Sequence, residues 1–279
     1  MIRLFSTIAM ALISFQIMAQ TNSLPVLPNQ NEDNFVVIAH RGASSYAPEN
    51  THSAFKLAIE LNAEMIELDV SLSKDGIPVV VHDETVDRTT NASGLVSSFT
   101  LSELKNLETG AWFSEKYKGE PFPTLEEVLS YTKNKIAVNI EIKTEAVTNN
   151  PSGGIIEKAL RIVKEAGVSD QVLFSSFDYR AMEHLEQLAP EMPKAILYEK
   201  SQSGELLPSE LVEKYKVDAF NCSHRQLSDK WIEDLKAKNI PFFIYTVNEK
   251  ELMKKVIENG ASGIFSDKPD LLKEVVENL

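Results

Sequence analysis

Three ionisable side chains in the stretch 65–83 stand where solubility does not require them. Glu67 and Asp69 interrupt an apolar run, and His82 follows the next apolar run. In an extended strand, side chains two residues apart project to the same face. The two carboxylates are therefore expected to point together, away from the apolar side chains between them. Aligned carboxylates close to a histidine at a strand end indicate either a metal site or acid–base catalysis.

Polar side chains also end two further apolar runs of the chain. His40 and Arg41 follow the first such run, and Glu141 and Lys143 alternate onto one face of the strand-like segment 136–143. In a β/α barrel, side chains at the carboxyl ends of the strands face the active site. One buried glutamate at a strand end is often merely paired with a lysine, but the pattern on four strands indicates a functional site.

The residue types define what such a site could bind. Three carboxylates, Glu67, Asp69 and Glu141, suit a hard divalent cation that prefers oxygen ligands. Zinc would instead favour histidine or cysteine. Arg41 and Lys143 suit an anion, because arginine can fork onto phosphate oxygens and lysine adds a point charge. A divalent cation and a bound phosphate are therefore expected side by side.

His40 and His82 are the residues placed to move protons near neutral pH. Combined with a cation and a phosphate clamp, two imidazoles describe phosphoester cleavage. The positive groups offset the growing charge on the phosphate, one histidine removes a proton from the nucleophile, and the other protonates the leaving alkoxide.

Aromatic residues could complete the site. Phe177 and Tyr245 end strand-like runs and could form an apolar wall for the organic part of a substrate. Trp112, in a glycine-containing loop, could cover the site, although simple loop packing explains it equally well. The other histidines carry weaker signals. Of these, His184 lies in a polar helix and is expected to be solvated, and His224 follows a strand and has a minor claim on the site.

The order of elements predicts the fold that positions these side chains. Strand-like and helix-like runs alternate, which indicates a parallel sheet with helices outside it, and we expect a TIM-type (β/α)8 barrel. Nine strand-like runs are present, one more than such a barrel needs. The connection from Asp69 to His82, with a turn at 74–76, is too short for a crossover helix and must return as extended chain. The poorly periodic segment 84–123 is expected to form a small loop-rich insertion after the third strand.

Composition and charge narrow the classes of partner. The chain has 279 residues, 43% of them hydrophobic, which is enough for a sizeable core, and a formal net charge of −13. No basic stripe is present, so nucleic acid is not an expected partner. The acidic balance would repel a free anion, so a phosphate site must supply its own positive charge. Cys222 is the only cysteine and is expected to be a small buried hydrophobe.

The amino terminus resembles a secretory signal rather than part of the fold. Arg3 precedes a short apolar stretch that ends near Ala19, and this stretch is too short for a comfortable transmembrane helix. We therefore expect a signal peptide at 1–19, a linker at 20–34 and a barrel domain at 35–279. The protein is expected to be exported, periplasmic or secreted, without stable membrane insertion once the signal is cleaved.

Several short motifs resemble those of the glycerophosphodiester phosphodiesterase family, whose barrel is of the phospholipase-C-like phosphodiesterase type. The resemblance covers nearly the whole chain after the leader, and HRG, ExD and H in this order and spacing are quite specific. One departure is Tyr245, where relatives often carry tryptophan. The motifs are HRG at 40–42, PENT at 48–51, ELD at 67–69, KDG at 74–76, HD at 82–83, EIK at 141–143, YTVN at 245–248 and SDKPD at 266–270.

The resemblance implies hydrolysis of deacylated phospholipids to sn-glycerol 3-phosphate and an alcohol. It implies that the three carboxylates hold Ca²⁺ or Mg²⁺, that His40 and His82 are the acid–base pair, and that Arg41 and Lys143 bind phosphate. Export favours Ca²⁺, which is abundant outside the cytoplasm. The motifs leave open which histidine is the base, and whether water attacks directly or the substrate's 2-hydroxyl forms a cyclic phosphate.

Two rival functions remain at this stage. A related phosphodiesterase of the same barrel type could cleave a lysophospholipid or a phosphoinositide, which would need an apolar access surface. A non-catalytic protein could bind phosphodiesters on the same barrel, but such a protein is expected to lose a histidine or a metal carboxylate. This chain keeps them all, which favours an enzyme.

Overall fold

The computed structural model describes Leu27 and residues 35–279. The predicted signal peptide at 1–19 and the rest of the predicted linker lie outside the described residues. The strands are β1 Val36–Ala39, β2 Met65–Leu72, β3 Pro78–Val80, β4 Ala137–Ile142, β5 Val172–Ser176, β6 Lys194–Leu197, β7 Ala219–Ser223, β8 Phe242–Tyr245 and β9 Gly263–Ser266. The α-helices are α1 His52–Glu60, α2 Leu101–Leu104, α3 Leu125–Thr132, α4 Ile155–Ala166, α5 Tyr179–Leu188, α6 Lys200–Ser203, α7 Pro208–Tyr215, α8 Asp229–Ala237, α9 Lys250–Glu258 and α10 Pro269–Glu277.

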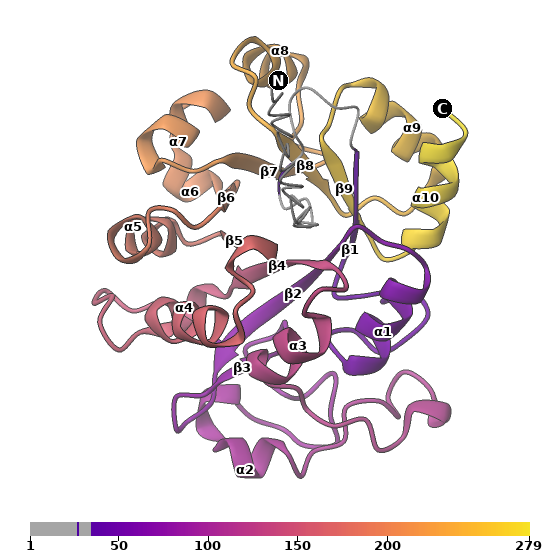
Figure 1. Cartoon of the computed structure of the whole chain (residues 1–279), viewed down its shortest axis with the longest axis vertical. Coiled ribbons are helices and arrows are strands. Elements are labelled where there is room, and N and C mark those ends of the chain that lie inside the picture. Colours follow the sequence, from indigo (N-terminus) through magenta and orange to yellow (C-terminus); the bar gives the residue numbers. More distant parts are fainter. Residues whose placement is uncertain (1–26, 28–34) are drawn as a thin grey trace, which may run out of the picture.

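Eight parallel strands form a closed barrel. Each strand from β4 to β9 pairs with its neighbour in the chain, β4 also pairs with β2, and β1 closes the ring by pairing with both β9 and β2. The longer helices surround the strands, so that the view down the ring shows an outer layer of helices (Figure 1). The predicted TIM-type barrel is confirmed.

The strand outside the eight of the barrel is β3, which forms the extended return predicted between Asp69 and His82. β3 pairs antiparallel with the end of β2, so that Val70 lies opposite Val80 and Leu72 opposite Pro78. β3 itself is not part of the ring. It carries His82 back to the end of the barrel at which Asp69 lies.

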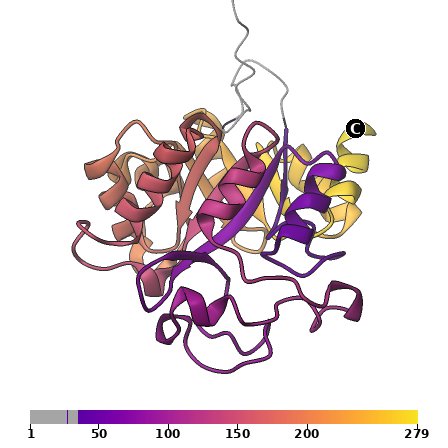
Figure 2. The same cartoon turned by 60° about the horizontal axis from the view of Figure 1, so that its bottom comes forward.

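The segment 84–123 forms the predicted insertion after the third strand. It contains α2 and two short 3₁₀ turns at Val96–Ser98 and Glu115–Tyr117, and otherwise consists of irregular chain. A small apolar cluster of its own holds it to β3, and this cluster includes Val79, Val96, Leu104 and Phe122. Figure 2 shows the insertion below the barrel, at the end toward which β2 runs.

The alternation of side chains along the strands produces two apolar layers. One layer fills the inside of the barrel and includes Ile38, Met65 and Phe243, with Leu27 packed against it. The other lies between strands and helices and includes Ile66 and Leu68. Because Ile66 and Leu68 face outward, Glu67 and Asp69 must face into the barrel, as the spacing predicts.

Two helices begin at threonine residues that cap them. Thr51 accepts a hydrogen bond from the backbone N–H of Ala54 at the start of α1. Thr124 and Glu127 form a capping box at the start of α3. Cys222 is fully buried, as predicted. Within the described part of the chain, no helix is both long and apolar enough to cross a membrane.

The prediction that His184 is solvated is wrong. Its side chain, on α5, is only 8% exposed. The chain between β4 and α4 lies against α5, where Arg180 of this helix donates to Asn149 Oδ1 and to the carbonyl of Val147. The polar sequence of α5 did not indicate that another segment packs over His184, because that segment lies more than thirty residues earlier in the chain.

Candidate active site

A cavity of about 190 Å³ opens at the carboxyl ends of the barrel strands. Most of the predicted site residues line it, although they come from segments far apart in the sequence. The strand ends bring them together, because parallel strands of a barrel all finish at the same end. The lining residues are His40, Arg41, Glu67, His82, Glu141, Ser175, Phe177, Leu197, Tyr245, Thr246 and Phe265.

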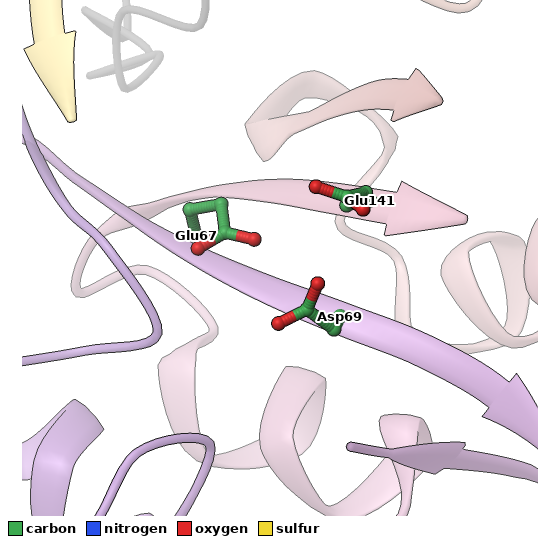
Figure 3. A group of neighbouring side chains, drawn as sticks. All are labelled: Glu67, Asp69 and Glu141. Atoms are coloured by element: carbon green, nitrogen blue, oxygen red, sulfur yellow. The ribbon is translucent and has the colours of Figure 1, made fainter. Parts of the chain in front are cut away.

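The three predicted metal carboxylates lie together beside this cavity. Figure 3 shows Glu67 and Asp69 on β2 and Glu141 on β4. One carboxylate oxygen from each residue lies within 4.8 Å of the others. The register of the sheet explains this proximity, since Asp69 pairs directly with Glu141. Glu67 and Asp69 are only 2% and 1% exposed.

Crowding of these carboxylates changes their proton affinity. Burial, together with the negative charge of Asp69, raises the pKa of Glu67 to about 8. Burial and Asp69 also raise the pKa of Glu141. The pKa of Asp69 itself is lowered despite burial, because Lys143, Arg41 and His82 surround it with positive charge. The group therefore holds less than its full negative charge near pH 7 in the absence of a cation.

The carboxylate group fits a hard divalent cation. Its donors are all oxygens, which Ca²⁺ and Mg²⁺ prefer. Oε1 of Glu67 is buried and has no hydrogen-bond partner among the described residues, and such an orphaned acceptor requires an explanation. A cation held by Glu67, Asp69 and Glu141 would use this oxygen and would offset their mutual repulsion.

The two predicted phosphate-binding residues flank the carboxylates. Nζ of Lys143 donates to Asp69 at 3.1 Å and to Glu141 at 2.8 Å. Nη1 of Arg41 donates to Glu49 at 3.0 Å, and its Nε lies 3.4 Å from Asp69 Oδ2 without a hydrogen bond. Burial lowers the pKa values of both Lys143 and Arg41, but the adjacent carboxylates more than reverse this effect. Both side chains therefore stay charged.

Arg41 is held in an unusual backbone conformation. Its φ is +55°, in the left-handed region that non-glycine residues seldom adopt. Its N–H donates to Glu67 Oε2 at 2.8 Å, and its carbonyl accepts from the N–H of Asn50 at 3.0 Å. Asn50 in turn donates its side-chain amide to Asp69 at 2.8 Å. The HRG and PENT segments are thus tied to each other and to the carboxylates, and the backbone strain is concentrated at a functional position.

Each of the two predicted catalytic histidines is hydrogen-bonded to an aspartate through Nδ1. The distance is 2.7 Å for His40 with Asp267 and 2.7 Å for His82 with Asp83. Burial lowers the pKa of His40, but the bond to Asp267 and the charge of Glu67 raise it above its usual value. Burial lowers the pKa of His82, and this effect prevails. The two imidazoles are therefore not equivalent.

The predicted aromatic residues are placed differently from one another. Phe177 and Tyr245 line the cavity, with their rings edge to face and their centroids 5.9 Å apart. Trp112 does not line it. Its indole lies under the guanidinium of Arg88, 5.9 Å from the ring centroid, and its Nε1–H donates to the carbonyl of Thr109. His52, His184 and His224 also lie outside the cavity lining.

Sequence reasoning assigned no role to several residues that orient the site. Asp267 accepts hydrogen bonds from His40, Ser44 and Asn248. Asp83 adjoins His82, so a carboxylate beside an imidazole was a usable signal. Asp267 had no such signal, because 227 residues separate it from His40.

Comparison with known proteins agrees with this geometry. Residues 40–271 match the model of the glycerophosphoryl diester phosphodiesterase family. A glycerophosphodiester phosphodiesterase of Caldanaerobacter subterraneus subsp. tengcongensis is 41% identical over 242 residues, covering 86% of this chain and 97% of that protein.

Two solved structures share the whole barrel. An Oleispira antarctica phosphodiesterase in complex with the product sn-glycerol-3-phosphate has a TM-score of 0.81 and 30% identity, over 91% of this chain and 99% of that one. A glycerophosphodiester phosphodiesterase from Agrobacterium tumefaciens has a TM-score of 0.74 and 28% identity, over 85% of this chain and 98% of that one. The predicted family and enzyme class are confirmed: the chain belongs to the glycerophosphoryl diester phosphodiesterase family.

Proposed function

We propose that this protein hydrolyses glycerophosphodiesters to sn-glycerol 3-phosphate and an alcohol by metal-dependent acid–base catalysis. One observation carries the proposal: a single cavity is lined by Arg41, by Glu67 and Glu141 and by two histidines that aspartates orient. Asp69 completes the carboxylate cluster beside it, and Lys143 donates to Asp69 and Glu141. Each group has a separate task in breaking a phosphodiester. The sn-glycerol-3-phosphate bound by the Oleispira relative supports the same product here.

His40 and His82 transfer the protons of the reaction. In a neutral imidazole whose Nδ1 is bonded to a carboxylate, the ring proton resides on Nδ1. Nε2 of each ring is then the atom that accepts or donates a proton on the cavity side. One histidine takes the proton of the nucleophilic hydroxyl, and the other gives a proton to the alkoxide that leaves.

Arg41 and Lys143 bind the phosphate, and the carboxylates hold the cation. Arg41 lines the cavity and has guanidinium donors besides the Nη1–H that binds Glu49, so it can donate to a phosphate oxygen. Glu67, Asp69 and Glu141 hold a divalent cation, which supplies Lewis-acid polarisation of the phosphoryl oxygen when bound. Phe177 and Tyr245 line the same cavity and would contact the carbon skeleton of the substrate.

The test is release of sn-glycerol 3-phosphate from glycerophosphocholine. Protein stripped with EDTA is expected to be inactive and to recover when Ca²⁺ or Mg²⁺ is added. Glu67→Gln should abolish the recovery, whereas Glu145→Gln, at an exposed carboxylate outside the cluster, should keep it. If metal binds but neither glycerophosphocholine, glycerophosphoethanolamine nor glycerophosphoglycerol is cleaved, the proposal is wrong. Cleavage of a lysophospholipid instead would favour the lipid-cleaving relative.

The identity of the general acid can be read from the leaving group. In a p-nitrophenyl ester of glycerol 3-phosphate, the leaving group is p-nitrophenolate. It departs without protonation, because p-nitrophenol is a much stronger acid than choline. Of His40→Ala and His82→Ala, the variant that lacks the general acid should cleave this ester nearly as well as the wild type. The variant that lacks the base should remain impaired on both substrates.

We further propose that the protein is exported and uses Ca²⁺. The apolar stretch before Ala19 supports export, and Ca²⁺ is abundant outside the cytoplasm. Mass spectrometry of protein recovered from the periplasm or medium should give an amino terminus near residue 20. Retention of the full chain in the cytoplasm would contradict export. Activation by Mg²⁺ together with inhibition by Ca²⁺ would contradict the choice of ion.

A further inference from the structure

Arg88, in the insertion, binds two carboxylates at once. Its Nε and Nη2 donate to Asp83 at 2.7 and 3.1 Å. Its Nη1 and Nη2 donate to Glu49 at 2.7 Å each. One guanidinium therefore makes four charge-assisted hydrogen bonds, two to each partner, and these partners lie 34 residues apart in the sequence.

Each of these carboxylates holds a different residue of the candidate site. Asp83 Oδ1 is 2.7 Å from Nδ1 of His82, and Glu49 Oε1 accepts from Nη1 of Arg41 at 3.0 Å. Arg88 is thus one carboxylate away from a proton-transfer residue and one carboxylate away from a phosphate-binding residue. A displacement of its guanidinium would act on both.

Arg88 itself stays outside the cavity. It is not among the residues that line it, and its side chain is 43% exposed. The indole of Trp112 lies against the guanidinium, 5.9 Å from ring centroid to Cζ. Its influence on the site must therefore pass through Asp83 and Glu49, rather than through contact with a substrate.

The arrangement depends on the shape of arginine as well as its charge. The planar fork supplies donors in fixed directions, so that two carboxylates can be held at a set distance from each other. A lysine would keep the charge but would offer three donors from one atom. Arg88 also offsets two negative charges beside a site for an anion. Its hydrogen bonds are the largest cause of the low pKa of Asp83, about 2, so Asp83 stays ionised beside His82.

We infer that Arg88 is a positioning residue, which fixes His82 through Asp83 and Arg41 through Glu49 and so makes the insertion part of the catalytic apparatus. This inference rests on the proposed function. It gives two separable expectations. Loss of alignment at His82 lowers kcat, and loss of alignment at Arg41 raises KM and weakens inhibition by sn-glycerol 3-phosphate.

The test compares Arg88→Lys and Arg88→Met with a matched pair at Arg180. Arg180 also forks onto one aspartate, Asp178, and is 42% exposed, but its hydrogen bonds reach none of the candidate catalytic or phosphate-binding residues. Activity is measured with saturating metal, well below the midpoint of thermal unfolding of each variant. Arg88→Met should lose roughly 10- to 100-fold in kcat, a range typical of outer-shell partners of a site. Arg88→Lys should unfold at a temperature close to that of the wild type but should still have a reduced kcat. Arg180→Lys should have the kcat and KM of the wild type.

A double-mutant cycle separates positioning from general support of the fold. Once Asp83 is replaced by asparagine, Arg88→Met should cost little further kcat, and once Glu49 is replaced by glutamine it should cost little further KM. If Arg88→Met does not fold, Arg88→Lys carries the test. Values of kcat and KM within twofold of an active wild type in Arg88→Lys, or full additivity in both cycles, would overturn the inference. An inactive wild type with bound metal would instead overturn the proposed function.

Discussion

Two aspartates determine which nitrogen of each candidate catalytic histidine is left without an aspartate partner. Asp267 and Asp83 occupy Nδ1 of His40 and His82, so Nε2 is left for proton transfer in both rings. The aspartates differ in their own support. Ser44 and Asn248 also donate to Asp267, whereas Arg88 holds Asp83. At the scale of single residues, the chemistry therefore depends on side chains that need not touch the substrate.

Replacing Asp267 should affect activity and acid stability together. Burial raises the pKa of Asp267, but the hydrogen bond from His40 lowers it to about 2, below the usual 3.8. A lowered pKa adds stability that is present above about pH 4 and disappears as the pH falls toward 2. Asp267→Asn should therefore lower the free energy of unfolding by roughly 2 kcal/mol at pH 6, and by about half as much at pH 3. Denaturant unfolding at both pH values measures this.

The control for Asp267→Asn is Asp270→Asn, three residues later in the first turn of α10. Asp270 accepts from Tyr46 and has no contact with His40. Asp270→Asn should leave kcat unchanged. Asp267→Asn should reduce kcat, because His40 loses its orientation. An equal stability loss at pH 6 and pH 3 for Asp267→Asn would show that the ionised carboxylate is not what stabilises this contact.

Glu67→Gln should not lower the thermal stability of the metal-free protein. With its pKa near 8, Glu67 is largely protonated near pH 7 when no cation is bound, so a neutral glutamine replaces a mostly neutral acid. The midpoint of thermal unfolding after EDTA treatment should match or exceed that of the wild type. Ca²⁺ at about 100 times its Kd should stabilise the wild type by about 2.7 kcal/mol and the variant far less. An equal calcium response in both proteins would remove Glu67 from the metal site.

Among single residues, the sequence revealed those whose type conflicts with their surroundings. Glu67, Asp69 and His82 stand out because charged groups seldom interrupt or end apolar runs without a task. Arg88 lies in a polar segment, where a charged residue is ordinary, and Asp267 follows β9 without any local sign of the residue that it contacts. Their importance comes from contacts across the fold, and a pattern of local spacing does not contain those contacts.

At the scale of elements, the loop after β1 depends on one close approach to α1. Gly42 has φ of +81°, and a Cβ added there would lie 2.7 Å from the backbone carbon of Ala54. This approach fixes the HRG turn that presents His40 and Arg41. Only glycine satisfies both the left-handed conformation and the contact.

Gly42→Ala should therefore destabilise the protein by about 3 kcal/mol or more, since overpacking adds to backbone strain. Gly119→Ala is the matched control. Its φ is +89°, but nothing lies within 4 Å of an added Cβ, so only the backbone cost of about 1 kcal/mol applies. Chemical denaturation of both variants measures the difference. Equal losses would mean that α1 moves aside without cost.

The elements themselves followed from the sequence where their pattern is local. Alternation of apolar runs predicted the barrel, and the short span between Asp69 and His82 predicted the extended return that became β3. The insertion at 84–123 was predicted as a small loop-rich segment, without its contacts to the rest of the fold. Arg88 joins it to Glu49, which precedes β2, and no periodic signal marks such a pairing.

At the scale of the whole molecule, the net charge opposes the entry of an anion. The formal charge is −13, and Arg41, Lys143 and Arg88 are already paired with carboxylates. Salt screens long-range repulsion between exposed charges and the substrate, with a Debye length of about 10 Å at 0.1 M. The acidic surface should repel a net-anionic diester more strongly than a zwitterionic one, so added salt should help the anionic diester more.

Raising NaCl from about 20 mM to about 200 mM should therefore increase kcat/KM for glycerophosphoglycerol relative to glycerophosphocholine by roughly twofold or more. Steady-state rates with both substrates at constant metal concentration measure the ratio. A matched sucrose series controls for effects on hydration. A ratio that falls with salt would mean that local positive charge outweighs the acidic surface.

The contact between His40 and Asp267 joins the loop after the first strand of the ring to the loop after the last. A chain that has not yet delivered its final strand cannot orient His40, however complete the rest of the barrel is. Catalysis should therefore appear only at the last step of ring closure. Partly synthesised or partly translocated chains should have no hydrolytic activity. Hydrolysis then reports topological completion of the fold, and a protein cut between α9 and β9 should regain activity only when the two fragments reassemble.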